Sequence, residues 1–412
     1  MAVTSKIDGP LWPVKGIRFA AVAAGVRYAN RADLVLFELT PGASVAAVFT
    51  RNAFCAAPVQ VARQHWQGST CRYLLVNTGN ANAGTGPQGL EDARACCAVV
   101  ARSATEREGV AVDDSQVLPF STGVIGQRLP VATIVAGIPA AFAALVEDDW
   151  IAAARGIMTT DTRPKAVSRR VAFSSGETVT ITGIAKGAGM LKPNMATMLA
   201  FVFTDARVEA QSLQVMLNQI TNESFNRITV DGDTSTNDAC LLVATGVSGV
   251  EISPNRQPDH DDFVSNLRAV FLTLATELIR DAEGATKFVT VIVEGGASSD
   301  ECLAVAYAIA ESPLVKTALF ASDPNWGRIL AAIGRAGLKE LNIDRLTIDL
   351  GETRLVENGG LAASYTEEAG QTEMDREEIT VTVNLARGTS KEIVWTSDLS
   401  QDYVRINADY RS

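Results

Sequence analysis

Histidine is scarce in this sequence: there are only two, His65 and His260, among 412 residues. His65 closes a mixed polar and apolar stretch and His260 lies in the acidic segment 258–262, so we expect both side chains at the solvated surface. A Ser-His-Asp triad or a multi-histidine metal site is poorly supplied by such a composition. If the protein catalyses acyl chemistry, its general base is therefore another group, and we expect no metal ion.

Clusters of basic residues are also missing. Lys and Arg number 36 against 47 Asp and Glu, which gives a formal net charge of −11. Phosphate binding needs grouped Lys and Arg, so neither nucleic acid nor an anionic membrane is an expected partner. The six cysteines include no C-x-x-C pair, and such scattered cysteines favour a reducing cytoplasmic location over a disulfide framework.

Long apolar runs are few, and the longest uncharged stretch covers residues 129–146. It contains Pro130, Gly137 and Pro139 among mostly small residues, which predicts a pair of packed helices rather than a membrane span. The N-terminal region lacks the basic-then-apolar pattern of a signal peptide, because Arg18 interrupts the apolar stretch nearby. We expect a cytoplasmic protein without a membrane segment.

Motifs that hold nucleotides or calcium fail at specific positions. The glycines in 187–189 follow a predicted strand, but Lys192 stands where a dinucleotide-binding loop needs its third glycine. The segment DGDTSTND (231–238) has the alternating oxygens of a calcium loop, but Thr236 replaces the turn glycine and the closing glutamate is absent. That segment predicts a turn or a hydrogen-bond network, with a structural and a functional use equally open. We expect no bound cofactor.

Helix-like and strand-like segments interleave along the chain, which predicts a layered α/β (α+β) fold. After about residue 290 the sequence becomes charged and rich in strands, so we expect a main catalytic domain over 1–289 and a smaller α/β C-terminal domain over 290–412. The predicted strands cover 72–76, 178–183, 198–204, 240–245, 288–293, 346–350 and 379–385. The predicted helical segments cover 89–103, 131–145, 212–222 and 263–280, with another beginning at 301.

One hydroxyl stands at an unusual boundary. The segment KGAGMLKPNMATMLAFVFTDA (186–206) passes from glycine- and proline-interrupted sequence directly into the apolar run 198–203, and Thr197 occupies the junction. A threonine at the head of a strand is usually structural, because β-branched residues favour strands. A nucleophilic role would need a proton acceptor. A cut between Ala196 and Thr197 would supply one, because an N-terminal threonine can use its own α-amine.

This junction resembles the self-cleaving segment of the ornithine acetyltransferase family, the bifunctional glutamate N-acetyltransferases of arginine biosynthesis. Eight further motifs resemble the same family, in the family's order, along the whole chain. Each motif alone is weak evidence, but nine in order are specific. The eight are TRNAFCAAPV (50–59), NTGNANAGTG (77–86), STGVIGQRLP (121–130), IMTTDTRPK (157–165), SFNRITVDGDTSTND (224–238), DAEGATK (281–287), SDPNWGRI (322–329) and YVRINADYRS (403–412).

The resemblance implies a precursor that cuts itself between Ala196 and Thr197, dividing the 412 residues into an α chain of 196 and a β chain of 216. The two chains would stay together and assemble as an α2β2 heterotetramer. The implied fold has an N-terminal threonine nucleophile and is similar to the N-terminal-nucleophile hydrolases in logic though not in topology. The implied reaction is a ping-pong transfer in which Thr197 takes the acetyl group of N2-acetyl-L-ornithine as an ester and passes it to L-glutamate. Some members also use acetyl-CoA as the donor, and none of these steps needs a cofactor.

The resemblance also assigns site residues at matching positions. Thr122 and Gly123 would stabilise the oxyanion, which suits a hydroxyl and a glycine N–H. Two positions depart from the usual family pattern, since Ala188 often corresponds to serine and Ser412 to threonine. The implied substrate-binding residues are Thr160, Lys186, Thr197, Glu283, Asn407 and Ser412.

Two other functions remain open from the sequence. Water instead of glutamate could attack the same ester, and the protein would then be an N-terminal-nucleophile amidase or deacetylase acting on N-acyl amino acids. The difference depends on water exclusion and on a pocket for the second amino acid. The third possibility is a binding protein that stays uncut. The retention of the motifs around Thr197 favours the transferase over both alternatives.

Overall fold

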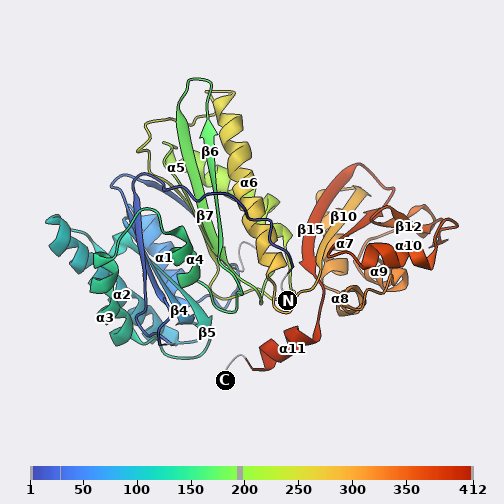
Figure 1. Cartoon of the computed structure of the whole chain (residues 1–412), viewed down its shortest axis with the longest axis horizontal. Helices are drawn as coiled ribbons and strands as arrows, with labels where there is room; N and C mark the ends of the chain where they lie inside the picture. The colour runs from blue at the N-terminus through green and yellow to red at the C-terminus, as the bar shows by residue number, and fades with distance from the viewer. Residues whose placement is uncertain (1–2, 28, 193–197, 410–412) are drawn as a thin grey trace.

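The structure is a computed structural model that describes residues 3–27, 29–192 and 198–409. Helices and three sheets alternate through these residues, so the predicted α/β class is confirmed (Figure 1). The strands are β1 Ile17–Val22, β2 Leu34–Leu39, β3 Ser44–Phe49, β4 Tyr73–Asn80, β5 Val117–Val124, β6 Lys165–Ala172, β7 Thr178–Lys186, β8 Leu199–Thr204, β9 Ala239–Ala244, β10 Phe288–Gly296, β11 Thr347–Leu350, β12 Thr353–Glu357, β13 Gly360–Leu361, β14 Glu378–Asn384 and β15 Ser390–Ser397. The helices are α1 Ala57–Gly68, α2 Gly86–Glu108, α3 Val131–Ala143, α4 Trp150–Gly156, α5 Ala210–Glu223, α6 Asp259–Arg280, α7 Ser299–Ala310, α8 Pro313–Phe320, α9 Trp326–Gly334, α10 Glu367–Met374 and α11 Gln401–Ala408.

Two sheets pack face to face and form a sandwich. One has the strand order β1-β2-β4-β5 and the other β3-β9-β8-β7-β6. Aromatic rings fill the space between them: the Phe201 ring lies 5.5 Å from that of Phe37 and 5.3 Å from that of Phe120. Strand β8 supplies Phe201 to this inner face, while its neighbours Ala200 and Val202 pack on the opposite face. A strand covered on both faces needs a continuous apolar run, which is why β8 is apolar from Leu199 to Phe203.

Helices cover both outer faces of the sandwich. Helices α2 and α3 pack on the sheet that contains β2, and α5 and α6 pack on the sheet that contains β8 (Figure 1). Helix α6 uses apolar side chains at three- and four-residue spacing, from Phe263 to Leu278, and these are fully buried. The result is a four-layer arrangement in which the strand ends at the base of the sandwich remain open for a site.

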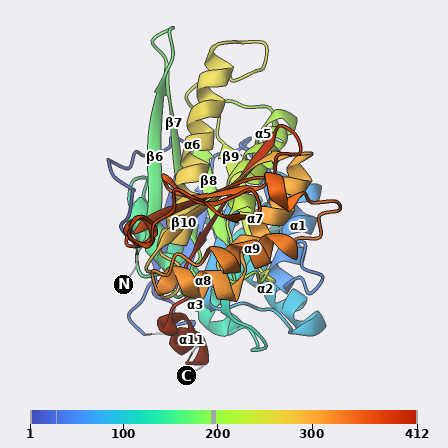
Figure 2. The same ribbon diagram turned by 90° about the vertical axis from the view of Figure 1, so that its right-hand side faces the viewer.

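The third sheet follows, with the strand order β13-β12-β11-β14-β10-β15. It has its own apolar core, which includes Val291 and Val381, and Figure 2 shows α7, α8 and α9 lying over it. A hydrogen bond of 3.0 Å from Thr229 N to Trp395 O joins it to the sandwich segment before β9. After β15 the chain turns back beneath the sandwich as α11 (Figure 1).

Two expectations from the sequence are wrong. His65 is only 7% exposed, because α1 packs against β5 and the His65 Nδ1 lies 2.8 Å from Val117 O. The stretch 129–146 contains the single helix α3, in agreement with the predicted helical segment 131–145 and not with the expected pair of helices, and Pro139 is accommodated inside it. His260 is half-buried, with its Nδ1 3.1 Å from Asp261 Oδ1.

Transmembrane segments can be assessed only for the described part of the chain. There, no single helix has the length and apolar composition to cross a membrane. Only α7 and α8 taken together, bent by 56°, pass that test of length and composition.

Candidate functional site

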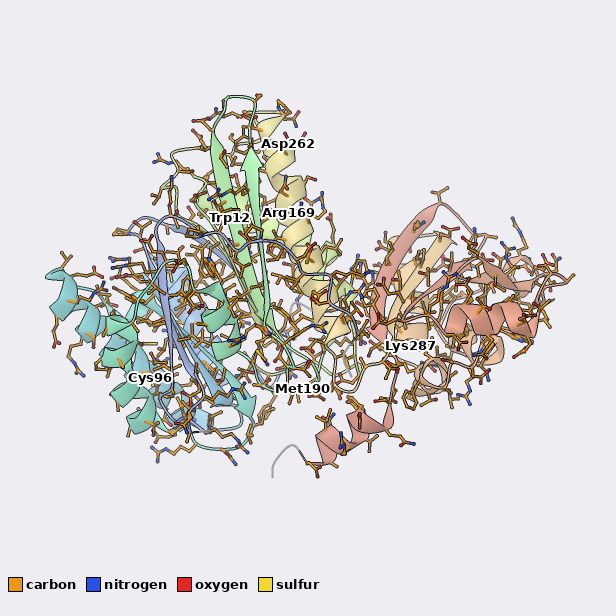
Figure 3. The ribbon with its side chains drawn as sticks, in the orientation of Figure 1. Trp12, Cys96, Arg169, Met190, Asp262 and Lys287 are labelled. Atoms are coloured by element: carbon orange, nitrogen blue, oxygen red, sulfur yellow. The ribbon has the colours of Figure 1, made fainter. Side chains whose placement is uncertain are left out.

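A cavity of about 230 Å³ lies at the base of the sandwich, where strand ends from both sheets meet. The ends of β5 and β7, the beginning of β8 and the residues directly before β9 contribute to its lining, and α11 closes one side. Figure 3 labels Met190, another lining residue, between the lower end of the sandwich and α11. The lining residues are Ala81, Thr122, Gly123, Val124, Ile125, Thr159, Thr160, Lys186, Gly189, Met190, Met198, Leu199, Ser235, Asn237, Asp238, Glu283 and Asn407.

Thr122 and Gly123 lie at the end of β5. Thr122 is 8% exposed, and its Oγ1 accepts a hydrogen bond of 2.9 Å from Lys186 Nζ. Gly123 has a φ of +133°, and a Cβ there would lie 2.3 Å from the carbonyl carbon of Gly79 on the adjacent strand β4. Only glycine fits this backbone. The local sequence therefore places a buried hydroxyl and a glycine side by side at the cavity wall.

Lys186 ends β7 and is the cation next to Thr122. Burial lowers the pKa of the Lys186 ammonium below its usual range, while the nearby carboxylate of Asp161 opposes that shift. Asp161 is held by Lys165 Nζ at 2.6 Å and by the N–H of Gly187 at 2.8 Å. Burial would raise the Asp161 pKa, but the two lysines more than offset it and hold that pKa below its usual range. Asp161 thus remains an anion that fixes the position of the β7 end.

Glu283 and Asn407 form the opposite side of the cavity. The Nδ2 of Asn407 donates to Glu283 Oε2 at 2.7 Å, and the Glu283 N–H donates to Ala188 O at 2.9 Å. Gly189 makes room for the carboxylate, since a Cβ at Gly189 would lie 2.3 Å from Glu283 Oε2. At Ala188 the contact with Glu283 comes from the backbone and needs no side-chain hydroxyl.

Thr160 lies between the main cavity and a second one. It lines both, together with Thr159, Gly123 and Val124. The second cavity has a volume of about 190 Å³ and extends toward two arginines near the N-terminus, Arg27 and Arg31. The position of Thr160 therefore suits contact with a substrate that extends away from the reacting centre.

The segment 231–238 is a hydrogen-bond hub. Asp231 accepts from the N–H of Met190 at 2.7 Å and from the hydroxyl of Tyr403 at 3.1 Å, which ties the glycine-rich segment to α11. Asn237 donates to Ala81 O at 2.6 Å and to Ser121 O at 2.9 Å, which joins this segment to the other sheet. The predicted hydrogen-bond network is therefore present, and it shapes the site wall.

Asn237 and Asp238 were not among the site residues expected from the sequence. Both are buried and line the cavity. The available signal was their position: polar residues directly precede the apolar strand β9, just as Thr197 directly precedes the apolar run of β8.

Three expected site residues, Ala196, Thr197 and Ser412, lie outside the described residues. Met198, which follows Thr197, lines the cavity. The other residues expected at the site, Thr122, Gly123, Thr160, Lys186, Glu283 and Asn407, also line it. A search of the described ranges for three or more grouped His, Cys, Asp or Glu side chains able to hold a metal ion finds none.

Known proteins similar to this chain cover nearly its whole length. The ArgJ family matches residues 18–412. The arginine biosynthesis bifunctional protein ArgJ of Psychrobacter arcticus is 54% identical over 404 residues, which are 98% of this chain and 97% of that protein. The protein of the same name from Methylococcus capsulatus is 55% identical over 405 residues, again 98% and 97% of the two chains.

A solved structure is similar over a shorter range. The crystal structure of arginine biosynthesis bifunctional protein ArgJ from Bacillus halodurans is 41% identical with a TM-score of 0.49, and the match covers 52% of this chain and 99% of that one. The family match and the two relatives, which are similar over nearly the whole chain, are sufficient by themselves to assign the family. This chain belongs to the ArgJ family.

Proposed function

We propose that this protein is an acetyltransferase of arginine biosynthesis that moves the acetyl group from N2-acetyl-L-ornithine to L-glutamate. It acts through an ester on Thr197, after the chain has cut itself between Ala196 and Thr197. The observation that carries the proposal is the convergence of distant motifs on one cavity that also contains Met198, the residue after Thr197. The full-length similarity to arginine biosynthesis bifunctional proteins supports the same reaction.

In the first half-reaction the Thr197 hydroxyl attacks the acetyl carbonyl and its proton passes to the Thr197 α-amine. Negative charge develops on the carbonyl oxygen, and Thr122 and Gly123 supply hydrogen bonds to it. The 2.9 Å hydrogen bond from Lys186 to Thr122 Oγ1 occupies a lone pair of that oxygen, so the hydroxyl hydrogen can point at the oxyanion. Ornithine then leaves, and the acetyl group remains on Thr197.

In the second half-reaction the amine of glutamate attacks the ester and the same oxyanion donors act again. N-acetylglutamate leaves, and the Thr197 hydroxyl is regenerated. Glu283 suits the ammonium group at the far end of ornithine, because a carboxylate held by Asn407 is a preorganised acceptor. Lys186 and Thr160 suit the carboxylate groups that both substrates carry.

The assembly and domain organisation are part of the proposal. We infer a main domain over 1–289 and a smaller domain over 290–412, which is supported by the separate apolar core of the third sheet. The two chains produced by cleavage would form an α2β2 heterotetramer, which size-exclusion chromatography with light scattering would test. Acetyl-CoA is proposed as a second acetyl donor, and the word "bifunctional" in the names of the relatives supports its inclusion in the assay.

A product assay tests the proposed function directly. Purified protein is incubated with N-acetylornithine, with and without glutamate, and acetate, ornithine and N-acetylglutamate are measured. We expect continuous N-acetylglutamate formation with glutamate, and about one ornithine released per site without it. Continuous acetate release that does not depend on glutamate would instead identify a hydrolase. The Thr197→Ala variant should be inactive, while Thr178→Ala, an exposed threonine on β7, should match the wild type.

A further inference from the structure

Asp238 is a buried acid with an unused oxygen in the cavity. It immediately precedes β9, is 3% exposed, and lines the same cavity as Thr122 and Lys186. Within the described part of the chain its Oδ2 has no hydrogen-bond partner. An unpartnered buried carboxyl oxygen is destabilising, and such exceptions in a folded protein need a specific explanation.

The backbone around Asp238 brings it next to the strand that follows the nucleophile. Strands β8 and β9 are parallel, with Leu199 opposite Ala239, and the Ala239 N–H donates to Met198 O at 3.0 Å. Residues at paired positions of parallel strands face the same side of the sheet, and both Met198 and Asp238 line the cavity. One peptide bond separates Met198 from Thr197. The carboxyl group therefore belongs to the chemical end of the cavity.

The position of Asp238 against β3 does not depend on its side chain. The contact that fixes this residue against β3 is made by its backbone, since Thr50 N donates to Asp238 O at 3.0 Å. That bond would survive removal of the carboxyl group.

The groups that face Asp238 favour a carboxyl that holds a proton. Burial raises its pKa well above the ordinary range, and the hydrogen bond from Ser235 and the charge of Lys186 oppose this only in part. The Glu283 carboxylate lines the same cavity and adds negative charge. Cys55 interacts electrostatically with Asp238, and burial raises the pKa of the Cys55 thiol while the charge of Arg63 opposes that shift. These surroundings match the pattern of a tuned catalytic carboxyl group.

One stored proton can serve both half-reactions. The Thr197 α-amine can carry the hydroxyl proton to the departing nitrogen, which gives a neutral amine. Free ornithine carries an α-ammonium, so the departing amine must take up one more proton. Glutamate enters as an ammonium and must lose one proton before it can attack. The protons balance if one group gives a proton in the first half-reaction and takes one up in the second.

We propose that Asp238 is this group, a catalytic residue that protonates the departing ornithine amine and later deprotonates the incoming glutamate ammonium. In the free enzyme Asp238 is a neutral carboxylic acid, and in the acetyl-enzyme it is a carboxylate. The inference rests on the proposed transfer reaction and adds to it a residue and a protonation state.

The first test compares Asp238→Asn with Asp205→Asn. Asp205 is a matched control: it follows β8, is 3% exposed, and burial raises its pKa as well, but its Oδ1 accepts from Thr180 N and it does not line the cavity. We expect Asp238→Asn to split into two chains like the wild type and to lose about 100-fold in kcat, because general acid–base catalysis contributes at least that much. It should also lose one limb of the pH profile of kcat. Asp205→Asn should keep the shape of that profile even if it lowers stability. A kcat for Asp238→Asn within about threefold of the wild type, with an unchanged pH profile, overturns the proposal.

The second test uses the wild-type protein and so does not depend on the folding of a variant. An infrared difference spectrum between the free enzyme and the acetyl-enzyme, formed with N-acetylornithine alone, should show the loss of one neutral carboxylic acid band. A spectrum without that loss contradicts the role of Asp238. The mass of the Thr197 chain is measured on the same sample. If no acetyl group is present on it, the proposed transfer reaction itself fails, so the two failures are distinguishable.

Discussion

The two sides of the cavity are built in different ways. The chemical wall, defined by Thr122, Lys186 and Asp238, comes from the ends and beginnings of sandwich strands, and all three side chains are buried. The recognition wall, defined by Thr160, Glu283 and Asn407, comes from loops and from α11, and Asn407 is exposed. Strand ladders and packed cores fix position closely, whereas loops and terminal helices tolerate more movement. From this comparison we expect the acyl chemistry to depend on the rigid sandwich, and recognition of the ornithine ammonium to depend on the loops and α11.

Of the changes to the two walls described here, loss of the Thr122 hydroxyl should reduce kcat most. Thr122→Ala removes one oxyanion donor, which typically raises the barrier by about 2.7–4 kcal/mol. We therefore expect kcat to fall by about 100- to 1,000-fold with a smaller change in KM. Steady-state kinetics on the cleaved fraction measure this, with Thr178→Ala as the control. A loss of less than about fivefold in kcat would remove Thr122 from the oxyanion site.

Lys186 should make kcat depend on pH. Since burial lowers its pKa, the ammonium should lose its proton, and its hydrogen bond to Thr122, below the ordinary lysine range near about 10.4. We expect kcat to fall as the pH rises through that lowered pKa, and Lys186→Met to reduce kcat about 10- to 100-fold, because hydrogen bonds to charged groups contribute about 1.5–3 kcal/mol. The pH profile of Lys186→Arg should lack this alkaline limb, while Lys391→Arg, on the surface, should retain it. An alkaline limb that persists in Lys186→Arg assigns the limb to another group.

Loss of the Glu283 charge should weaken substrate binding more than it slows the chemical step. It therefore tests the division of the cavity into two walls. Glu283→Gln removes the charge proposed to meet the ornithine ammonium, so KM for N-acetylornithine should rise about tenfold with kcat within about threefold. Gly189→Ala is an independent probe, since its Cβ would displace the Glu283 carboxylate, and it should raise KM in the same way. If both variants lowered kcat and left KM unchanged, the division into two walls would be wrong.

Asn407 should give the smallest effect. Its Nδ2 also donates to Tyr403 O at 3.0 Å, and the exposed side chain orients Glu283 rather than carrying charge. Solvent around the exposed Asn407 side chain weakens its hydrogen bond to the Glu283 carboxylate to about 1 kcal/mol, so Asn407→Ala should raise KM about fivefold or less and leave kcat unchanged. Gln401→Ala, at the exposed start of the same helix, is the control. A large fall in kcat for Asn407→Ala would show that α11 takes part in the chemistry.

Much of the fold could be predicted from the sequence, because its strongest patterns are local. The apolar run 198–203 predicts β8, and the stripe from Phe263 to Leu278 predicts α6, since each pattern follows from the faces that these elements bury. The errors arise where tertiary packing decides. His65 is buried because α1 packs on β5, and α3 continues through Pro139; neither outcome has a signal in the neighbouring residues.

Less of the site than of the fold could be predicted from the sequence. The motif resemblance identified Thr122, Lys186 and Glu283, and the structure adds that they line one cavity with residues from both sheets. Their roles stay predictions. The segment 231–238 was singled out from the sequence, but no role could be assigned to Asp238, because its burial and its unpartnered oxygen arise only when β8 and β9 pair. A polar residue before an apolar strand is too common a pattern to identify a proton carrier.

The most direct test of the account is the denatured mass of the protein after incubation with N-acetylornithine in the absence of glutamate. The account predicts two polypeptides, of 196 and 216 residues, with the longer one beginning at Thr197 and heavier by one acetyl group, which glutamate then removes. A single 43.6 kDa species, or two chains with no acetyl group on either, would contradict it.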